Sequence, residues 1–238
     1  MMKSILLFLL LSISSLAQTV NLDMLDWMTM DSFGSYTKGT GAAMWTVMDS
    51  AQSQFYWVKN SKGYPWDVKK WDANFIYDTI TEINWTDPSA YKKHIGPNGK
   101  GYPLTPRYVP YVPGAPAKNL STILIPPSGT TFEIHSSCSK YTVSNLGYAK
   151  TEVWGPFYES FGGDLPPNLQ TLHLNWLWSC DSSYNNCKTK EQFTLTKVYG
   201  NVRWNNYQLQ NGKYVLLQAS TRNTVQPGTA TAVHPCWK

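Results

Sequence analysis

Alternation of apolar and polar side chains is the feature that most constrains the fold of this chain. In residues 171–178 each even-numbered position carries Leu or Trp, whereas the odd-numbered positions are polar until Leu177. A period of two is that of a β-strand, because successive side chains of a strand point to opposite faces. This segment therefore predicts a strand with one face in a hydrophobic core.

Similar segments recur along the chain. Residues 131–138 place Phe132 and Ile134 on one face and Glu133 and His135 on the other. Further strands are predicted at 44–48, 54–59, 74–85, 191–199 and 213–220.

A helical period is nearly absent from the sequence. Residues 21–33 alone fit one, and they fit the period of a strand as well. Asn211-Gly212 is a typical two-residue turn of a β-hairpin. We therefore predict an all-β fold with little helix, a two-sheet antiparallel β-sandwich of jelly-roll-like form.

The first 17 residues predict a signal peptide. Lys3 supplies a positive start, residues 5–11 are an unbroken apolar run, and Ser15 and Ala17 suit cleavage before Gln18. The run is too short for a helix to span the ~30 Å hydrocarbon core of a bilayer. A buried N-terminal helix is the alternative. We expect a secreted protein, extracellular or periplasmic, without a membrane span.

Four cysteines predict two disulfide bonds, because an even number in an exported chain favours oxidation. Cys180 and Cys187 bracket six polar residues, which predicts a bridge across the base of a hairpin loop. That pairing leaves Cys138 with Cys236. A zinc site is the rival interpretation, but the cysteines lack the C-x₂₋₄-C spacing of such sites, and we predict no metal.

A proline-rich segment interrupts the pattern of strands. Repeated proline favours extended polyproline II structure and excludes a central strand. The prolines stand at positions 103, 106, 110, 113 and 116. We predict that the segment runs along the outside of a single β-rich domain, residues 18–238. In the alternative, two β subdomains at 18–102 and 117–238 are joined by residues 103–116.

The charge distribution of the chain argues against nucleic-acid binding, and its composition is rich in aromatic residues. Charged residues make up 15% of the chain, against ~25% in typical soluble domains. Aromatic residues make up 14%, with 11 Trp and 15 Tyr. Basic residues are scattered and form no stripe, so we expect no nucleic-acid partner.

Aromatic residues near turns are the best candidates for ligand binding. The C–H faces of sugar rings stack on flat aromatic side chains, which combine apolar area with a polar edge. Filling of a large β-sandwich core is the alternative role. The candidates are Trp154, Tyr158, Trp66 and Trp71. Trp154 precedes a Gly-Pro break, so we expect it at the rim of the sandwich, next to the polar face of 131–138.

Candidate catalytic residues lie on the polar faces of two predicted strands. Glu133 and His135 are two residues apart on one strand, and His173 lies on another beside Asn175. If the two strands are neighbours, these groups form an acid–base set. Solvated strand faces carry such residues without any function as well. The sequence has no common nucleophile, metal-binding or nucleotide-binding motif, and we predict no cofactor.

The leading functional prediction is non-catalytic binding of a polysaccharide or a cell-surface glycan. A secreted glycoside hydrolase or polysaccharide lyase is the alternative, with Glu133, His135 and His173 as its acid–base set. A structural or adhesive surface protein without a small ligand fits the same composition. The sequence leaves open whether the chain is an enzyme, its oligomeric state, and glycosylation at the N-x-S/T sites of Asn84 and Asn119.

Overall fold

The computed structural model describes residues 18–29, 33–36, 44–59, 65–82, 89–227 and 236. The predicted signal peptide (1–17) and Asn84 lie outside these residues. Strands account for 63% of the structure and helix for 6%. The predicted all-β class is therefore confirmed, and antiparallel sheets pack against each other as expected for a sandwich. Within the described ranges, no helix is long and apolar enough to cross a bilayer.

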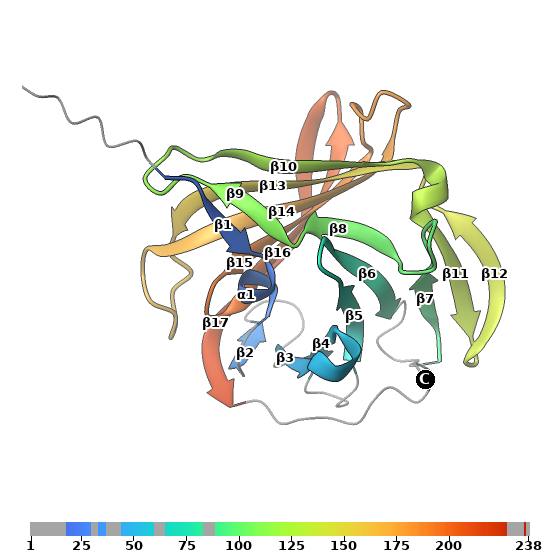
Figure 1. Cartoon of the computed structure of the whole chain (residues 1–238), viewed down its shortest axis with the longest axis horizontal. Coiled ribbons are helices and arrows are strands. Elements are labelled where there is room, and N and C mark those ends of the chain that lie inside the picture. Colours follow the sequence, from blue (N-terminus) through green and yellow to red (C-terminus); the bar gives the residue numbers. More distant parts are fainter. Residues whose placement is uncertain are drawn as a thin grey trace, which may run out of the picture.

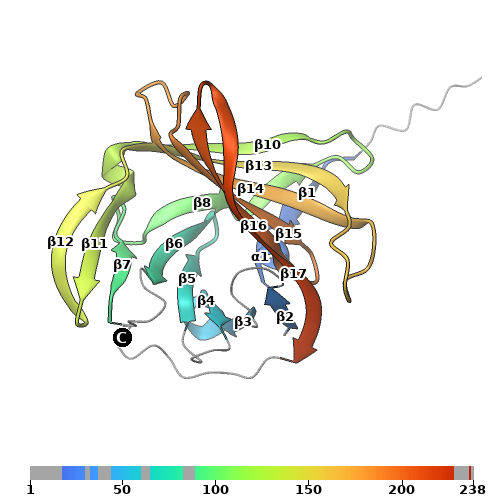
Figure 2. The same cartoon turned by 180° about the vertical axis from the view of Figure 1, so that it is seen from behind.

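One large sheet has the strand order β10-β13-β14-β15-β16-β17-β2 among the described residues. Figure 1 shows β10, β13 and β14 across the upper part of the molecule and β17 and β2 at its lower left, and Figure 2 shows the sheet from behind. Neighbouring strands are antiparallel throughout. The strands are β2 (Phe33–Tyr36), β10 (Lys118–Ile125), β13 (Tyr148–Glu159), β14 (Leu169–Cys180), β15 (Thr189–Thr196), β16 (Gly200–Gln210) and β17 (Lys213–Pro227).

The facing sheet has the order β12-β11-β7-β6-β5-β4-β3, with β8 paired to β6 outside this path. A small third sheet pairs β1 (Val20–Asp23) with β9 (Tyr108–Tyr111). The strands of the facing sheet are β3 (Met44–Asp49), β4 (Gln54–Lys59), β5 (Pro65–Trp71), β6 (Phe75–Glu82), β7 (Tyr91–His94), β8 (Tyr102–Pro106), β11 (Thr131–Ser136) and β12 (Ser139–Asn145).

In the segment that fitted both periods, the described residues form a strand and then a single helical turn, and Phe33 begins β2. β1 is followed by α1 (Leu25–Met28), and the N–H of Leu25 donates to Asp23 Oδ1 at 3.0 Å. Two 3₁₀ turns, Ser50–Gln52 and Pro127–Thr130, complete the helical content of the described residues. The short helix buries Trp27 and Met28 because its apolar side faces the space between the sheets.

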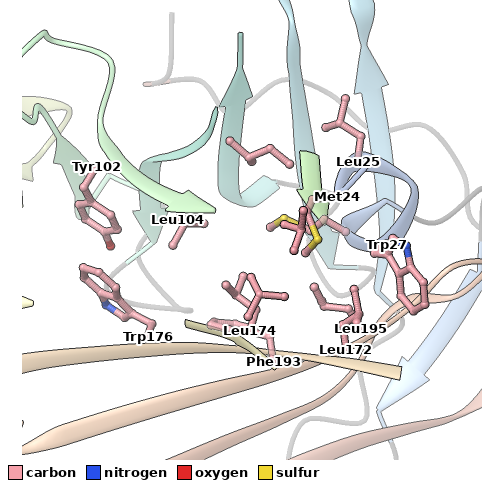
Figure 3. Packing of buried hydrophobic residues seen from close by; sticks show 14 of the residues in the cluster. Met24, Leu25, Trp27, Tyr102, Leu104, Leu172, Leu174, Trp176, Phe193 and Leu195 are labelled. Carbon is pink, nitrogen blue, oxygen red and sulfur yellow. The ribbon is translucent and has the colours of Figure 1, made fainter. Parts of the chain in front are cut away.

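The hydrophobic core lies between the two large sheets and draws residues from both halves of the chain. Figure 3 shows Tyr102 and Leu104 of β8 opposite Leu174 and Trp176 of β14. The rings of Tyr102 and Trp176 stack at 4.6 Å between centroids, with 6° between their planes. Leu172 and Leu174 are completely buried, as the period-two pattern of β14 predicts.

The expectation for the proline-rich segment is wrong in one respect. Instead of running outside the sheets as polyproline II, it forms β8 and β9, and Tyr102, Leu104 and Val109 are buried. The reason is that several of its non-proline residues are large and apolar and enter the core. β8 has β6 as its one strand partner among the described residues, an edge position where proline is tolerated.

Both predicted disulfide pairings are confirmed: Cys180 with Cys187, and Cys138 with Cys236. The first bridge closes a loop with a sequence separation of 7, and the second joins residues separated by 98 positions. A disulfide that closes a longer loop removes more entropy from the unfolded chain.

We therefore expect the two bridges to stabilise the fold unequally. Replacing Cys138 and Cys236 by Ser lowers the free energy of unfolding by ~5 kcal/mol, and replacing Cys180 and Cys187 lowers it by ~2 kcal/mol, from loop-closure entropy. Urea unfolding of the two double variants under non-reducing conditions measures the difference. Equal losses would contradict this ranking.

Gly101 fixes the approach of β8 to β6. Its φ is +92°, and a Cβ atom placed there would collide with the carbonyl oxygen of Asp78. Gly99 in the same loop also has a positive φ, +68°, but a Cβ atom there would have nothing within 4 Å. A side chain at Gly99 would therefore cause backbone strain alone, whereas a side chain at Gly101 would cause backbone strain and a steric clash.

Gly101→Ala is expected to cost ~3 kcal/mol or more, because β8 must move away from β6. Gly99→Ala is the matched control and costs ~1–2 kcal/mol, the strain of a left-handed Ala. Thermal and urea unfolding of both variants tests this. Similar losses for the two variants would show that the contact with Asp78 is not tight.

Candidate functional site

A pocket of about 210 Å³ lies between the two large sheets. We call the side formed by β4 to β8 the floor and the side formed by β14, β15 and β16 the roof. Thr81, Lys92, Trp178 and Glu191 line the pocket and are partly exposed, so the pocket reaches the surface there. The deeper lining residues are buried in the core.

The roof is aromatic because of strand register. Trp176 and Trp178 are two residues apart on β14 and therefore share a face, as do Glu191 and Phe193 on β15. Trp176 stands opposite Glu191 in the ladder, and Phe193 stands opposite Trp204 of β16. All of these side chains line the pocket. Glu191 is thus a carboxyl group within an aromatic wall.

The floor carries a buried charge network. Lys69 Nζ lies 2.6 Å from Asp67 Oδ1 on the same strand and donates to Asp78 Oδ1 on β6 at 2.8 Å. The three side chains are 9% exposed or less. Lys69 also lies over the ring of Trp57, 5.0 Å from its centroid. Buried ions persist in proteins when they are paired and hydrogen-bonded in this way.

The pKa values of the two carboxyl groups in this network are shifted in opposite directions. Burial raises the pKa of Asp67 well above its ordinary range. Burial also acts to raise the pKa of Asp78, but the ammonium of Lys69 outweighs it and holds that pKa below its ordinary value. Burial opposes the charge on Lys69, yet the two carboxylates keep its pKa above the usual one. Asp78 is therefore the carboxylate that stays ionised beside Lys69.

Tyr102 and His94 complete the floor. The hydroxyl of Tyr102 donates to Asp78 Oδ2 at 2.7 Å, and His94 Nε2 lies 3.3 Å from the same hydroxyl. His94 Nδ1 is buried without a hydrogen-bond partner in the described structure. Burial lowers the pKa of His94 to about 4, so its ring is neutral at pH 7. The buried groups of the floor thus carry little net charge, and Lys92 adds a cation where the pocket is partly exposed.

Glu191 is a second carboxyl group of this pocket, besides Asp67, whose pKa is raised. Burial raises its pKa to about 7, opposed by a hydrogen bond from Trp204 and assisted by the charge of Asp78. Paired groups whose surroundings shift their pKa values in opposite directions are typical of functional sites. Glu191 and Asp78 form such a pair across the pocket.

Sequence reasoning missed this site because polar residues at every second position resemble a solvated strand face. Asp67 and Lys69 share their phase with Trp71, which is partly buried and packs against the core. That shared phase is the one signal in the sequence that this face of β5 points inward. The partners of Lys69 come from two strands, a fact that no local pattern contains.

The structure does not assemble the catalytic set expected from the sequence. His135 Nε2 lies 3.0 Å from Glu133 Oε2 on β11, whereas His173 lies on β14 in the opposite large sheet. His173 Nε2 is instead 2.7 Å from Glu159 Oε2. The acid–base set was predicted on the condition that the two strands are neighbours, and this condition is not met, because β11 pairs with β7 and β12 and not with β14.

The aromatic residues predicted to bind a ligand lie in different environments in the structure. Trp154 and Tyr158 are 36% and 62% exposed, and Trp154 Nε1 donates to Glu152 Oε2 at 2.9 Å. Trp71 packs on Phe55, with 6.2 Å between ring centroids, and so helps to fill the core. The side chain of Trp66 lies outside the described residues.

The residues beside Trp154 differ from those that the sequence predicted. Trp154 stands opposite Asn119 on one side and His173 on the other. It therefore lies in the large sheet that does not contain Glu133 and His135. A glycan-binding role for Trp154 and Tyr158 stays a prediction, with His173 as the nearby polar group.

Comparison with protein-family models, curated proteins and solved structures gave no match to this chain. Among the described residues, no group of three or more His, Cys, Asp or Glu side chains is arranged to hold a metal ion. The site is therefore interpreted from its own geometry.

Lys69→Met is expected to lower the free energy of unfolding by ~3–5 kcal/mol, because it leaves buried carboxylates without their cation. Lys70→Met changes the next residue, which is exposed, and should alter stability by no more than ~0.5 kcal/mol. Urea unfolding at pH 7 measures both. A Lys69→Met variant as stable as its control would show that the ion pair is not needed.

Proposed function

We propose that this protein acts outside the cytoplasm and binds a neutral saccharide, such as the end of a glycan, in the pocket between the sheets. The observation that carries the proposal is the division of the pocket into an aromatic roof and a polar floor. Flat indole rings suit the C–H faces of a sugar, and fixed polar groups suit its hydroxyls.

The buried charges of the pocket favour a neutral ligand at its deep end, whereas the cation of Lys92 lies where the pocket is partly exposed. Lys69 and Asp78 offset each other, and His94 carries no charge at pH 7. A uronic acid would bring its carboxylate close to Asp78, and an amine would be repelled by Lys69. A ligand with many hydroxyl groups and no charge avoids both costs.

The volume of the pocket limits the ligand to a small unit. At about 210 Å³ it is below the ~300–1,000 Å³ that is usual for drug-sized ligands. A terminal sugar residue suits this space better than an internal stretch of a polysaccharide chain. The partly exposed Trp178 and Glu191 then lie where the next unit of the chain would leave the pocket.

The two disulfides support a location outside the reducing cytoplasm. The signal-like pattern of residues 1–17 is that of an exported protein. Export is consistent with a glycan as the ligand, because polysaccharides are abundant outside cells.

The exposed surface around Trp154 and Tyr158 is the alternative place for a glycan to bind. Trp154 is held by its hydrogen bond to Glu152 and keeps about a third of its surface accessible. Single-residue variants separate this surface from the pocket, because Trp154 and Trp178 are far apart in the ladder of strands and only Trp178 lines the pocket.

Trp178→Ala is expected to weaken glycan binding about 5- to 100-fold, since stacking on one aromatic is worth ~1–3 kcal/mol. Trp154→Ala is the matched control and should leave the affinity unchanged. A glycan array identifies the ligand, and calorimetric titration of both variants measures affinity, with circular dichroism as the test of folding.

Each other outcome has a definite meaning. Loss of affinity in Trp154→Ala alone would move the site to the exposed surface with Tyr158. Loss of folding in Trp178→Ala would call for Trp178→Phe, which keeps an aromatic face and should retain most of the affinity. Wild-type protein that binds no glycan on the array would favour a structural or adhesive role.

A further inference from the structure

We call the partly exposed end of the pocket, at Thr81, Lys92, Trp178 and Glu191, its mouth. We propose that the mouth selects a glycan whose terminal unit is neutral and whose second unit carries an anionic substituent, which Lys92 binds. The substituent is a uronic carboxylate or a sulfate ester, because both present negatively charged oxygens. This selection rests on the proposed binding of a glycan end in the pocket, and it adds the chemical class and the order of the units.

Lys92 places a positive charge in the mouth. It lies on β7 in the floor, two residues before His94, and both side chains line the pocket because alternate residues of a strand share a face. Lys92 Nζ lies over the ring of Phe132 on β11, 5.1 Å from its centroid. This cation–π contact restricts the long side chain, so less freedom is lost when a ligand binds the ammonium.

The two lysines of the pocket differ in their partners. Lys69 at the deep end contacts the carboxylates of Asp67 and Asp78. In the part of the chain that the structure describes, no ion pair joins Lys92 to an Asp or Glu side chain, and this includes Glu191 in the roof of the mouth. The charge of Lys92 is therefore the one that a ligand can neutralise.

Thr81 supplies a second polar group beside Lys92. The two residues stand directly opposite each other in the ladder of β6 and β7, and the Cβ atoms of such pairs lie about 5 Å apart. His94 Nε2 lies 3.4 Å from Thr81 Oγ1, and a proton on this nitrogen lets the Thr81 hydroxyl donate to a ligand. An ammonium and a hydroxyl side by side suit two oxygens of one anionic group.

The two ends of the pocket favour different units of a glycan. An acidic group at the deep end would be buried beside Asp78, which stays ionised, and Lys69 is already paired there. Burying a charge without a partner is costly. At the mouth the same group meets the cation of Lys92 and keeps part of its hydration. The neutral unit therefore enters the pocket, and the acidic unit follows it.

Trp178 directs the chain past Lys92. The ring of Trp176 is already stacked on Tyr102 in the core. Trp178 lines the same pocket from the roof and is partly exposed, so it offers an aromatic surface at the mouth. A glycan that lies against Trp178 passes between roof and floor as it leaves the pocket, with Lys92 on the floor side.

The first test uses a glycan array that carries neutral and acidic units in both orders, with uronic and with sulfated units. We expect the wild-type protein to bind glycans that end in a neutral unit followed by an acidic one. Glycans of the same composition that end in the acidic unit should bind at least ~5-fold more weakly. Carboxyl reduction removes the charge of a uronic unit and desulfation that of a sulfated unit, so the treatment that weakens binding identifies the anion.

The second test compares Lys92→Met with Lys93→Met, which cause the same change in net charge. Lys93 is exposed, stands opposite Glu133 and does not line the pocket. In calorimetric titrations, wild type and Lys93→Met should bind the acidic glycan about 5- to 10-fold more tightly than its charge-removed form. Lys92→Met should bind both forms with the affinity of wild type for the charge-removed form. Circular dichroism tests the folding of each variant.

Ionic strength gives a readout that needs no variant. Raising the salt concentration from about 0.05 M to about 0.5 M screens a partly exposed ion pair. The preference of the wild-type protein for the acidic glycan should then fall by about half or more. Its affinity for the charge-removed form should change little.

The possible failures of the two proposals are distinguishable. Wild-type protein that binds the acidic glycan and its charge-removed form equally would exclude the role of Lys92 and leave glycan binding in the pocket intact. Equal binding of both orders of units would exclude a neutral unit at the deep end. A preference that persists in Lys92→Met, or disappears in Lys93→Met, would contradict an anion bound at the mouth. Absence of binding to every glycan on the array would overturn the proposed function as well.

Discussion

The buried ion pair between Lys69 and Asp78 is the interaction on which the rest of this structure depends. Removing an ammonium and a carboxylate from water costs several kcal/mol for each ion. The cost is offset here because Lys69 contacts two carboxylates and Asp78 receives a hydrogen bond from Tyr102. This arrangement requires β5, β6 and β8 to lie in one fixed register. The polar floor of the pocket follows from that register.

The two sheets supply different chemistry to the space between them. The seven-stranded sheet provides flat aromatic side chains such as Trp176, and the facing sheet provides Asp78, His94 and their hydrogen bonds. The facing sheet also contributes Trp57 and Leu104, so its polar groups lie among apolar side chains. Glu191 is the carboxyl group of the aromatic side, and burial there raises its pKa. Packing of the sheets thus creates the properties that we attribute to the pocket.

Much of the architecture could be predicted from local pattern. The period of two in residues 171–178 correctly identified β14 and its buried face, and the cysteine spacing correctly identified both bridges. The proline-rich segment was misjudged, because proline content masked the apolar residues Tyr102 and Leu104 that enter the core. An edge position in a sheet satisfies both the prolines and the core, and edge positions cannot be read from composition.

The sequence by itself determined the all-β class, several of the strands and the pairing of the cysteines. The class and these strands follow from the period of two, and the pairing follows from the short spacing of Cys180 and Cys187, which leaves one other pair. Only the tertiary structure decided which polar faces meet. Glu133 and His173 look equivalent in the sequence, yet they lie in opposite sheets. Asp67, Lys69 and Glu191 look like solvated residues, yet they line a pocket. Strand order and sheet packing are long-range properties, and a local pattern carries no record of them.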